Sequence, residues 1–139
     1  MLSIPMTIPA RAFPLMVFLL AVACQGAERL DRFEEALGCY RTEAGQPVLQ
    51  VAPDARVSDP RGTQLAIASL RVEGDVSLLN FAPALVASDD GSGIVTAREP
   101  ARSHMIDALG AETILALQRR DVTAPPVLLK RFPGPCGRD

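Results

Sequence analysis

Residues 65–81 read LAIASLRVEGDVSLLNF, which is two apolar-rich runs joined by Gly74 and Asp75. The runs 65–72 and 76–81 have the length and the residue types of β-strands. A glycine at the first central position of a two-residue turn suits the type II′ geometry, which joins adjacent antiparallel strands. This stretch therefore predicts a β-hairpin, and it favours an antiparallel arrangement for the chain around it.

Short runs broken by turn residues continue this pattern on both sides of the hairpin. The Asp-Pro-Arg-Gly sequence at 59–62 is a strong turn signal, because proline presets one backbone dihedral angle and glycine frees another. Glycine, serine and aspartate dominate the stretch 89–93 in the same way. The predicted strands outside the hairpin cover residues 39–43, 48–51, 94–97 and 127–132.

Two segments predict helix instead of strand. Residues 27–37 place Leu30, Phe33 and Leu37 on one helical face, and Gly38 is well suited to end that helix. In the segment 101–120, Ser103 is a candidate cap for a second short helix ending at Gly110. Residues 114–117 then either continue this helix or begin a strand, and we favour the strand.

The first 23 residues have the layout of a bacterial export signal. Arg11 precedes a run of 12 mostly apolar residues, and the small residues Ala21 and Ala23 stand just before Cys24. The run is shorter than the roughly 20 apolar residues that span a bilayer. We therefore expect a signal peptide at 1–23 and a single small exported domain at 24–139, with a helix at 27–37 and a β-rich core at 38–136.

Cleavage before Cys24 has two interpretations. Ordinary signal peptidase would release a soluble periplasmic or secreted chain. Residues 20–24, Leu-Ala-Val-Ala-Cys, resemble the lipobox of bacterial lipoproteins, although alanine stands where leucine is usual. This resemblance implies lipid on Cys24 and anchoring in the periplasm or at the outer membrane, with which Gln25 is compatible.

The two remaining cysteines, Cys39 and Cys136, form an even pair in an oxidising compartment if Cys24 carries lipid. They stand at the start of the first predicted strand and just after the last one. A bridge between them would fasten a sheet that closes on itself, whereas the alternative is two unrelated thiols. The predicted fold class is thus β-rich α+β, a small antiparallel sheet or barrel-like domain with a short N-terminal helix.

A second resemblance concerns shape alone. The sequence Gly38-Cys39-Tyr40 resembles the Gly-x-Trp start of lipocalins, with tyrosine in place of tryptophan. This resemblance is consistent with a barrel and implies no ligand.

Candidate catalytic and metal-binding residues do not assemble into a site in the sequence. Adjacent residues on a helix point in different directions, so Ser103 and the only histidine, His104, do not form a nucleophile–base pair, and His104 is expected to be exposed. The stretch 89–93 lacks the context of a serine hydrolase, and it offers too few oxygen ligands for calcium. We assign no catalytic, cofactor-binding or metal-ligating residue and expect no cofactor.

Charge and aromatic content exclude some partners. Without residues 1–23, 13 basic residues face 16 acidic ones, and hence the formal net charge is −3, which gives no electrostatic footprint for nucleic acid. Phe33, Tyr40, Phe81 and Phe132 are the only aromatic residues of this part, too few for a stacking platform.

Basic residues near the C-terminus suggest one further contact. Arg119 and Arg120 could meet Lys130 and Arg131 across the final hairpin and touch anionic lipid head groups, or they could form an ordinary solvent-exposed face.

These observations predict a small exported envelope protein, lipid-anchored through Cys24. It would act as a non-enzymatic binding or structural module for a protein partner or a small apolar ligand. A periplasmic hydrolase is one alternative. A secreted enzyme inhibitor is another, and residues 83–93 and 121–126 are its candidate exposed loops.

Overall fold

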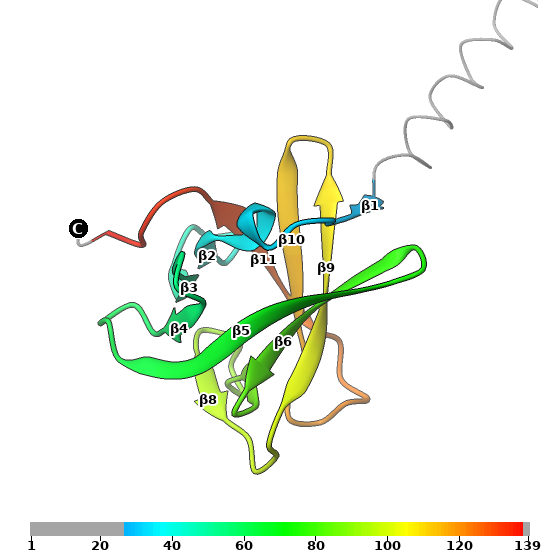
Figure 1. Cartoon of the computed structure of the whole chain (residues 1–139). Coiled ribbons are helices and arrows are strands. Elements are labelled where there is room, and N and C mark those ends of the chain that lie inside the picture. Colours follow the sequence, from blue (N-terminus) through cyan, green and yellow to red (C-terminus); the bar gives the residue numbers. More distant parts are fainter. Residues whose placement is uncertain (1–26, 138–139) are drawn as a thin grey trace, which may run out of the picture.

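The computed structural model describes residues 27–137, so the predicted signal peptide 1–23 and the predicted lipidation site Cys24 lie outside the described residues. Strands dominate the described chain (Figure 1). The elements are β1 Ala27–Arg29, a 3-10 helix η1 Phe33–Ala36, β2 Gly38–Arg41, β3 Pro47–Val51, β4 Arg56–Ser58, β5 Gln64–Glu73, β6 Val76–Ala82, β7 Leu85–Ala87, β8 Ile94–Thr96, β9 Arg102–Leu109, β10 Glu112–Leu117 and β11 Val127–Phe132.

Eight of the strands close into an antiparallel barrel. Strands β2 to β6 each pair with the next, β6 pairs with β9, β9 to β11 continue the series, and β11 pairs with β2. The β7–β8 hairpin forms a separate small sheet inserted between β6 and β9, and β1 extends the barrel by pairing with the second half of β9. The predicted barrel-like antiparallel architecture is therefore present.

Side chains from the barrel strands fill its interior. In β6, the buried Ser77, Leu79 and Phe81 alternate with half-exposed residues, as the two-residue period of a strand requires. Phe81 lies opposite the buried Ala68 of β5, and Leu79 lies opposite the buried His104 of β9. The buried apolar side chains of the barrel strands include Tyr40, Leu49, Val51, Val57, Ala66, Ala68, Leu79, Phe81, Ile106, Leu115, Leu117 and Leu129.

Different segments cover the two ends of the barrel. At one end, residues 27–37, here called the strap, bring the buried Leu30 and Ala36 onto the core. The Leu30 amide donates to the Ser77 hydroxyl (2.9 Å) and the Tyr40 hydroxyl donates to the Ala36 carbonyl (2.6 Å). At the other end, the β7–β8 hairpin contributes the buried Leu85 and Ala87.

The helix predicted over 27–37 is wrong. The backbone of Ala27–Arg29 forms strand β1, which pairs with β9, and only Phe33–Ala36 makes a short 3-10 turn. Leu30, Phe33 and Leu37, whose spacing resembles a helical face, belong to a strap that crosses the barrel end. The conformation of the strap backbone is set by tertiary contacts and not by helix propensity. Among residues 27–137 there is no helix long and apolar enough to cross a membrane.

The helix predicted at the start of 101–120 is also wrong. Residues 102–109 and 112–117 form the antiparallel pair β9–β10, and Gly110, with φ of +65°, lies in the turn between them instead of ending a helix. On β9 the inward side chains of His104 and Ile106 are buried, whereas the outward Met105 is exposed. Because β9 has apolar residues on both faces, its sequence does not show the alternation of apolar and polar residues that is typical of a strand.

The predicted disulfide joins Cys39 to Cys136, across 97 residues of sequence. The tail after β11 returns along the outside of the barrel. There, the Cys136 amide donates to the side-chain oxygen of Gln50 (2.9 Å), and the Arg41 guanidinium donates to the Cys136 carbonyl (3.0 Å). The bridge thus fastens the tail beside β2 and β3, close to where β11 and β2 close the barrel.

Candidate functional site

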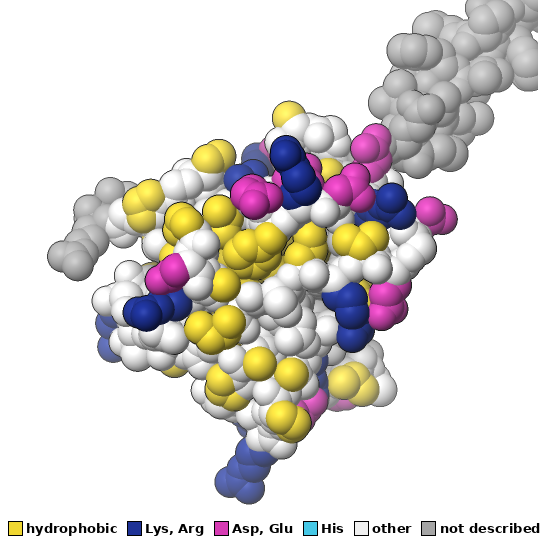
Figure 2. Space-filling view, viewed as in Figure 1, with side chains coloured by type: hydrophobic (Ala, Val, Ile, Leu, Met, Phe, Trp, Pro, Cys, Tyr) yellow, Lys and Arg dark blue, Asp and Glu magenta, His cyan; other side chains and the backbone are white. Residues whose placement is uncertain are grey.

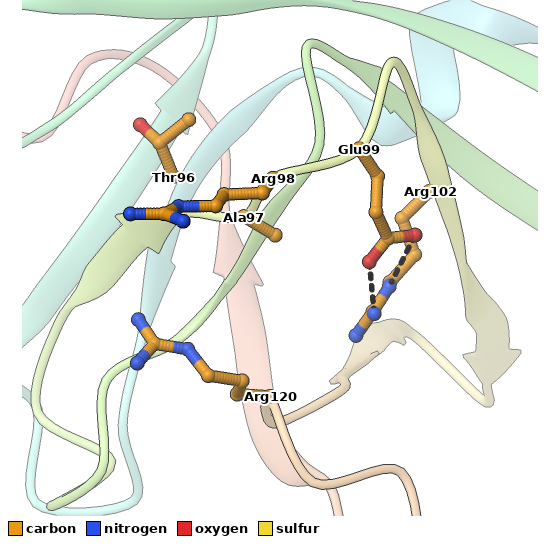
Figure 3. Close-up of a pocket in the computed structure, with 6 residues that line it drawn as sticks. All are labelled: Thr96, Ala97, Arg98, Glu99, Arg102 and Arg120. Atoms are coloured by element: carbon orange, nitrogen blue, oxygen red, sulfur yellow. Dashed lines mark hydrogen bonds and ion pairs between the residues drawn. The ribbon is translucent and has the colours of Figure 1, made fainter.

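A pocket lies at the end of the barrel covered by the β7–β8 hairpin. It encloses about 480 Å³ and combines the end of β8, the connection to β9 and the start of the connection after β10 (Figure 3). We call it the arginine pocket. Its lining residues are Thr96, Ala97, Arg98, Glu99, Arg102 and Arg120.

One arginine of this pocket is held by its surroundings. The Arg102 guanidinium forms an ion pair with the Glu99 carboxylate, and it also donates to the Arg119 carbonyl (3.2 Å). These contacts tie the start of β9 to the segment after β10. Arg102 therefore has a structural role that keeps the wall of the pocket in place.

The other two arginines are different. Arg98 and Arg120 are exposed, and within residues 27–137 neither side chain has an ion-pair partner. Figure 3 shows their guanidinium groups on the same side of the pocket, one above the other, while Arg102 and Glu99 lie together on the opposite side. A guanidinium donates two parallel hydrogen bonds to a carboxylate or a phosphate, so two of them beside one pocket suit an oxyanion.

The loop that carries Arg120 is anchored by its neighbour Arg119. The Arg119 guanidinium donates to the carbonyl of Asp89 in the β7–β8 turn (2.9 Å) and to that of Pro125 (3.0 Å). Further along the loop, the Asp121 carboxylate accepts from the hydroxyl (2.7 Å) and the amide (3.0 Å) of Thr123. The hydroxyl bond is the larger cause of the lowered pKa of Asp121.

His104 is buried inside the barrel, contrary to the expected exposure. Its Nδ1 accepts from the amide of Gln118 (3.0 Å), which leaves Nε2 to donate to the Leu85 carbonyl (2.9 Å). Desolvation lowers the pKa of His104 to about 4, so the ring is neutral at pH 7. Ser103 points elsewhere and donates to the side-chain oxygen of Asn80 (3.0 Å), so the two residues form no nucleophile–base pair.

Residues 89–93 form the turn of the β7–β8 hairpin, as predicted. One carboxylate oxygen of Asp90 accepts from the Ser92 amide (3.0 Å) and from the hydroxyls of Ser88 and Ser92 (2.8 Å each). These bonds, the amide of Ser92 first, lower the pKa of Asp90 to about 2. Within residues 27–137, no group of three or more His, Cys, Asp or Glu side chains is placed to hold a metal ion.

The basic spot considered as one possibility for the C-terminal residues does not form. Lys130 pairs with Glu112 on the outside of the barrel, whereas Arg131 donates to the carbonyl of Leu37 in the strap. Arg119 and Arg120 lie at the far end, beside the β7–β8 hairpin. The arginine pocket was missed because its members come from two segments about 20 residues apart, and the sequence does not place those loops together.

A second feature is an apolar patch on the outside of the barrel. Leu109, Ile114, Leu128 and Phe132, here called the apolar wall, line a shallow groove of about 460 Å³ across β9, β10 and β11. The exposed fractions of Leu109, Leu128 and Phe132 are 47 %, 62 % and 40 %. Lys130 and Arg41 lie over the Phe132 ring, with their charged groups 5.4 and 5.7 Å from its centroid.

The strap end carries a different surface. Figure 2 shows hydrophobic side chains along the seam between η1 and β5, with acidic side chains around the strap. The half-buried Phe33 and Leu37 on the strap, and Leu65 and Leu70 on β5, pack against the core. This seam therefore belongs to the closure of the barrel end.

No protein-family model, curated protein or solved structure matches this chain at a significant level.

Proposed function

We propose that this protein is an exported, lipid-tethered module without catalytic activity that binds a protein partner through the arginine pocket. The pocket would receive a carboxylate of the partner, from a side chain or a chain terminus. The observation that carries the proposal is the pair Arg98 and Arg120, two guanidinium groups on one side of the pocket that form no ion pair within residues 27–137, since the Glu99 carboxylate across the pocket is paired with Arg102.

Electrostatics support an anionic partner. Two like charges side by side repel each other, and an oxyanion placed between them relieves that repulsion while accepting several hydrogen bonds. Arg102 cannot supply this function, because Glu99 already neutralises it. The ion pair instead stiffens the pocket wall from which Arg98 projects.

Export and tethering are supported by the sequence and by the disulfide. Disulfides persist in oxidising compartments outside the cytosol, and Cys39–Cys136 is such a bond. The apolar run 12–23 and the lipobox-like residues 20–24 supply the corresponding signal. Acyl chains on Cys24 would hold the protein at the membrane by apolar burial.

A small apolar ligand is the weaker alternative for this barrel. In lipocalin-type barrels such a ligand occupies the interior, but here side chains such as Phe81, Leu115 and Leu129 are fully buried there. An apolar ligand would have to bind on the outside. A partner would therefore bind on the outer surface of the barrel and not in its interior.

A second candidate function is inhibition of an enzyme. The two loops suggested for that role, 83–93 and 121–126, are brought together because Arg119 binds carbonyl groups of both. A rigid double loop beside the arginine pocket suits insertion into a cleft. Once a partner is captured by crosslinking, its enzymatic turnover with and without this chain separates inhibition from simple binding.

The test of the pocket is a nuclear magnetic resonance titration with two defined probes, a glutamate-rich peptide and inorganic phosphate. The peptide should shift resonances of residues 96–102 and 120, and the Arg98→Gln/Arg120→Gln variant should bind it at least about tenfold more weakly, since a hydrogen bond to a charged group contributes about 1.5–3 kcal/mol. Preference for phosphate would redirect the proposal to phosphorylated ligands.

The matched control is Arg61→Gln, since Arg61 is also exposed and has no ion-pair partner within the described residues. It should bind the peptide as the parent does. Shifts spread evenly over all exposed arginines, or equal loss of binding in the control, would contradict a specific pocket.

Tethering is tested by mass spectrometry of the mature protein. We expect a chain that begins at Cys24 with added acyl mass, and a Cys24→Ala variant found in the soluble fraction. A mature parent chain without lipid would contradict the tether and leave the pocket proposal standing.

A further inference from the structure

We infer that the apolar wall of Leu109, Ile114, Leu128 and Phe132 rests on the surface of the lipid bilayer to which the protein is tethered. This inference deepens the proposed function and depends on its lipid anchor at Cys24. It assigns the arginine pocket to the partner and the apolar wall to the membrane, two separate surfaces of one barrel.

The length of the tether supports this placement. Only two residues, Gln25 and Gly26, lie between Cys24 and Ala27, and the three residue steps from Cys24 to Ala27 span at most about 10 Å. Strand β1 is fixed to the barrel, because Ala27 is paired with Leu109 and Arg29 with Asp107 of β9. A lipid on Cys24 therefore holds Leu109, which is the first residue of the wall, close to the bilayer.

The composition of the wall is unusual for a surface that faces water. Outward positions of an antiparallel barrel are commonly polar, yet here large apolar side chains occupy three adjacent strands. Register places Leu128, Ala116 and Met105 side by side across β11, β10 and β9, whereas Ile114 stands between Lys130 and Asp107, and Leu109 stands beside Glu112. The ammonium group of Lys130, which lies among them, is paired with Glu112 and stands 5.4 Å from the centroid of the Phe132 ring, so these two charges neutralise each other within the wall.

Charge decides which side of the barrel faces the lipid. The strap is equally close to the anchor, but its exposed charges are four acidic residues, Glu28, Asp31, Glu34 and Glu35, against the two basic residues Arg29 and Arg32. At the wall, Glu112 is neutralised by its ion pair with Lys130. An anionic bilayer repels such a cluster, and the hydrated carboxylates gain nothing from contact with acyl chains. The domain therefore turns its strap away and lays the wall of β9–β11 on the surface.

The chain contains no tryptophan, so a single introduced one reports on one place. We place it at the wall with Phe132→Trp and on the opposite side of the barrel with Ile67→Trp. The two parent side chains are similarly exposed, at 40 % and 45 %, and β11 and β5 stand four strands apart in the eight-strand barrel. Leu128→Trp is a second wall reporter in case one substitution disturbs folding.

The experiment uses the mature lipidated chain, purified from membranes and inserted into vesicles of zwitterionic and anionic phospholipid. Brominated acyl chains quench tryptophan fluorescence only at short range. We expect the wall reporters to shift to shorter wavelength and to lose most of their emission in brominated vesicles, while the Ile67→Trp emission stays unchanged.

Two failures are distinguishable. A chain that carries acyl mass and floats with the vesicles, but whose wall and Ile67→Trp reporters are quenched alike or not at all, overturns the wall contact and leaves the tether intact. A chain without acyl mass that does not float overturns both the tether and this inference.

Discussion

The Nε2 atom of His104 on β9 lies 2.9 Å from the carbonyl oxygen of Leu85, the first residue of β7. The same ring accepts from the Gln118 amide just after β10, so one imidazole joins three segments at the end of the barrel. Its Nδ1 must be free of a proton to do so. The packing of the β7–β8 hairpin on the barrel thus requires a neutral histidine.

Acid should therefore destabilise the fold through His104. The pKa of this group falls from 6.5 to about 4 on folding, so the unfolded chain binds the proton more readily than the folded one. The stabilisation is complete above pH 6.5 and is lost as the pH falls toward 4, with a full size of about 3 kcal/mol. Urea unfolding at several pH values between 4 and 7 measures it.

The control for this prediction is His104→Gln. The chain has no other histidine, so the variant should be less stable at pH 7 yet vary much less in stability between pH 5 and 7. Parallel pH profiles of the parent and the variant would show that His104 is not the group responsible.

Two adjacent arginines should respond differently to the same substitution. Arg119→Gln removes two hydrogen bonds to the carbonyls of Asp89 and Pro125 and should lower the free energy of unfolding by about 1–2 kcal/mol. Arg120→Gln touches no such contact and should stay within about 0.5 kcal/mol of the parent. Denaturant unfolding of both variants measures the difference, and equal losses would contradict the separate roles assigned to these two residues.

The Ser77 hydroxyl should hold the strap to the barrel. It accepts from the Leu30 amide and donates to the Ile106 carbonyl, and both contacts are buried. Ser77→Ala leaves these two groups without a partner, at a loss of about 1–3 kcal/mol. Hydrogen exchange at the Leu30 amide should accelerate as well.

Ser69→Ala on the neighbouring strand is the control, because Ser69 is exposed and should tolerate the change. Unchanged exchange at Leu30 in Ser77→Ala would sink this account of the strap.

Removal of the disulfide should lower stability substantially. Cys39 and Cys136 close a loop of nearly the whole barrel, and the chain-entropy model gives about 4–5 kcal/mol for a loop of this size. The Cys39→Ala/Cys136→Ala variant, compared with the parent under oxidising and reducing conditions, measures the contribution. A parent protein whose midpoint does not respond to reductant would contradict it.

Several strands could be predicted because their turns are local. Gly74 and Asp75 set the β5–β6 hairpin, and the predicted last strand matches β11 at both ends. The Cys39–Cys136 bridge could be predicted because only two cysteines remain after Cys24, and they stand at the start of the first barrel strand and just after the last one. In each case the signal lies within a few residues or in a residue type with few possible partners.

The two helix predictions and the expected exposure of His104 were wrong because they depend on tertiary contacts that cannot be inferred from the sequence. Leu30 and Phe33 are spaced as on a helix, but pairing with β9 extends the backbone of Ala27–Arg29, and only Phe33–Ala36 makes a short 3-10 turn. His104 was expected to be exposed because Met105 and Leu109, its apolar neighbours, suggested a helical face, whereas both point outward from a strand. The arginine pocket depends on how Arg119 positions the loop after β10, which only the folded barrel determines.

The order of the strands also bears on how the molecule acquires its shape. Six of the eight barrel pairings join strands that are consecutive in the chain, and β6 and β9 are separated only by the β7–β8 hairpin. Only β2 and β11 must find each other from opposite ends of the barrel sequence. Local pairing of this kind favours assembly by successive addition, with the meeting of the two ends as the final step. The disulfide between Cys39 and Cys136 would then form after the barrel has closed. With Cys24 acylated as proposed, no third thiol would compete for the bond, so maturation in the proposed envelope location would require an oxidant but no disulfide isomerase.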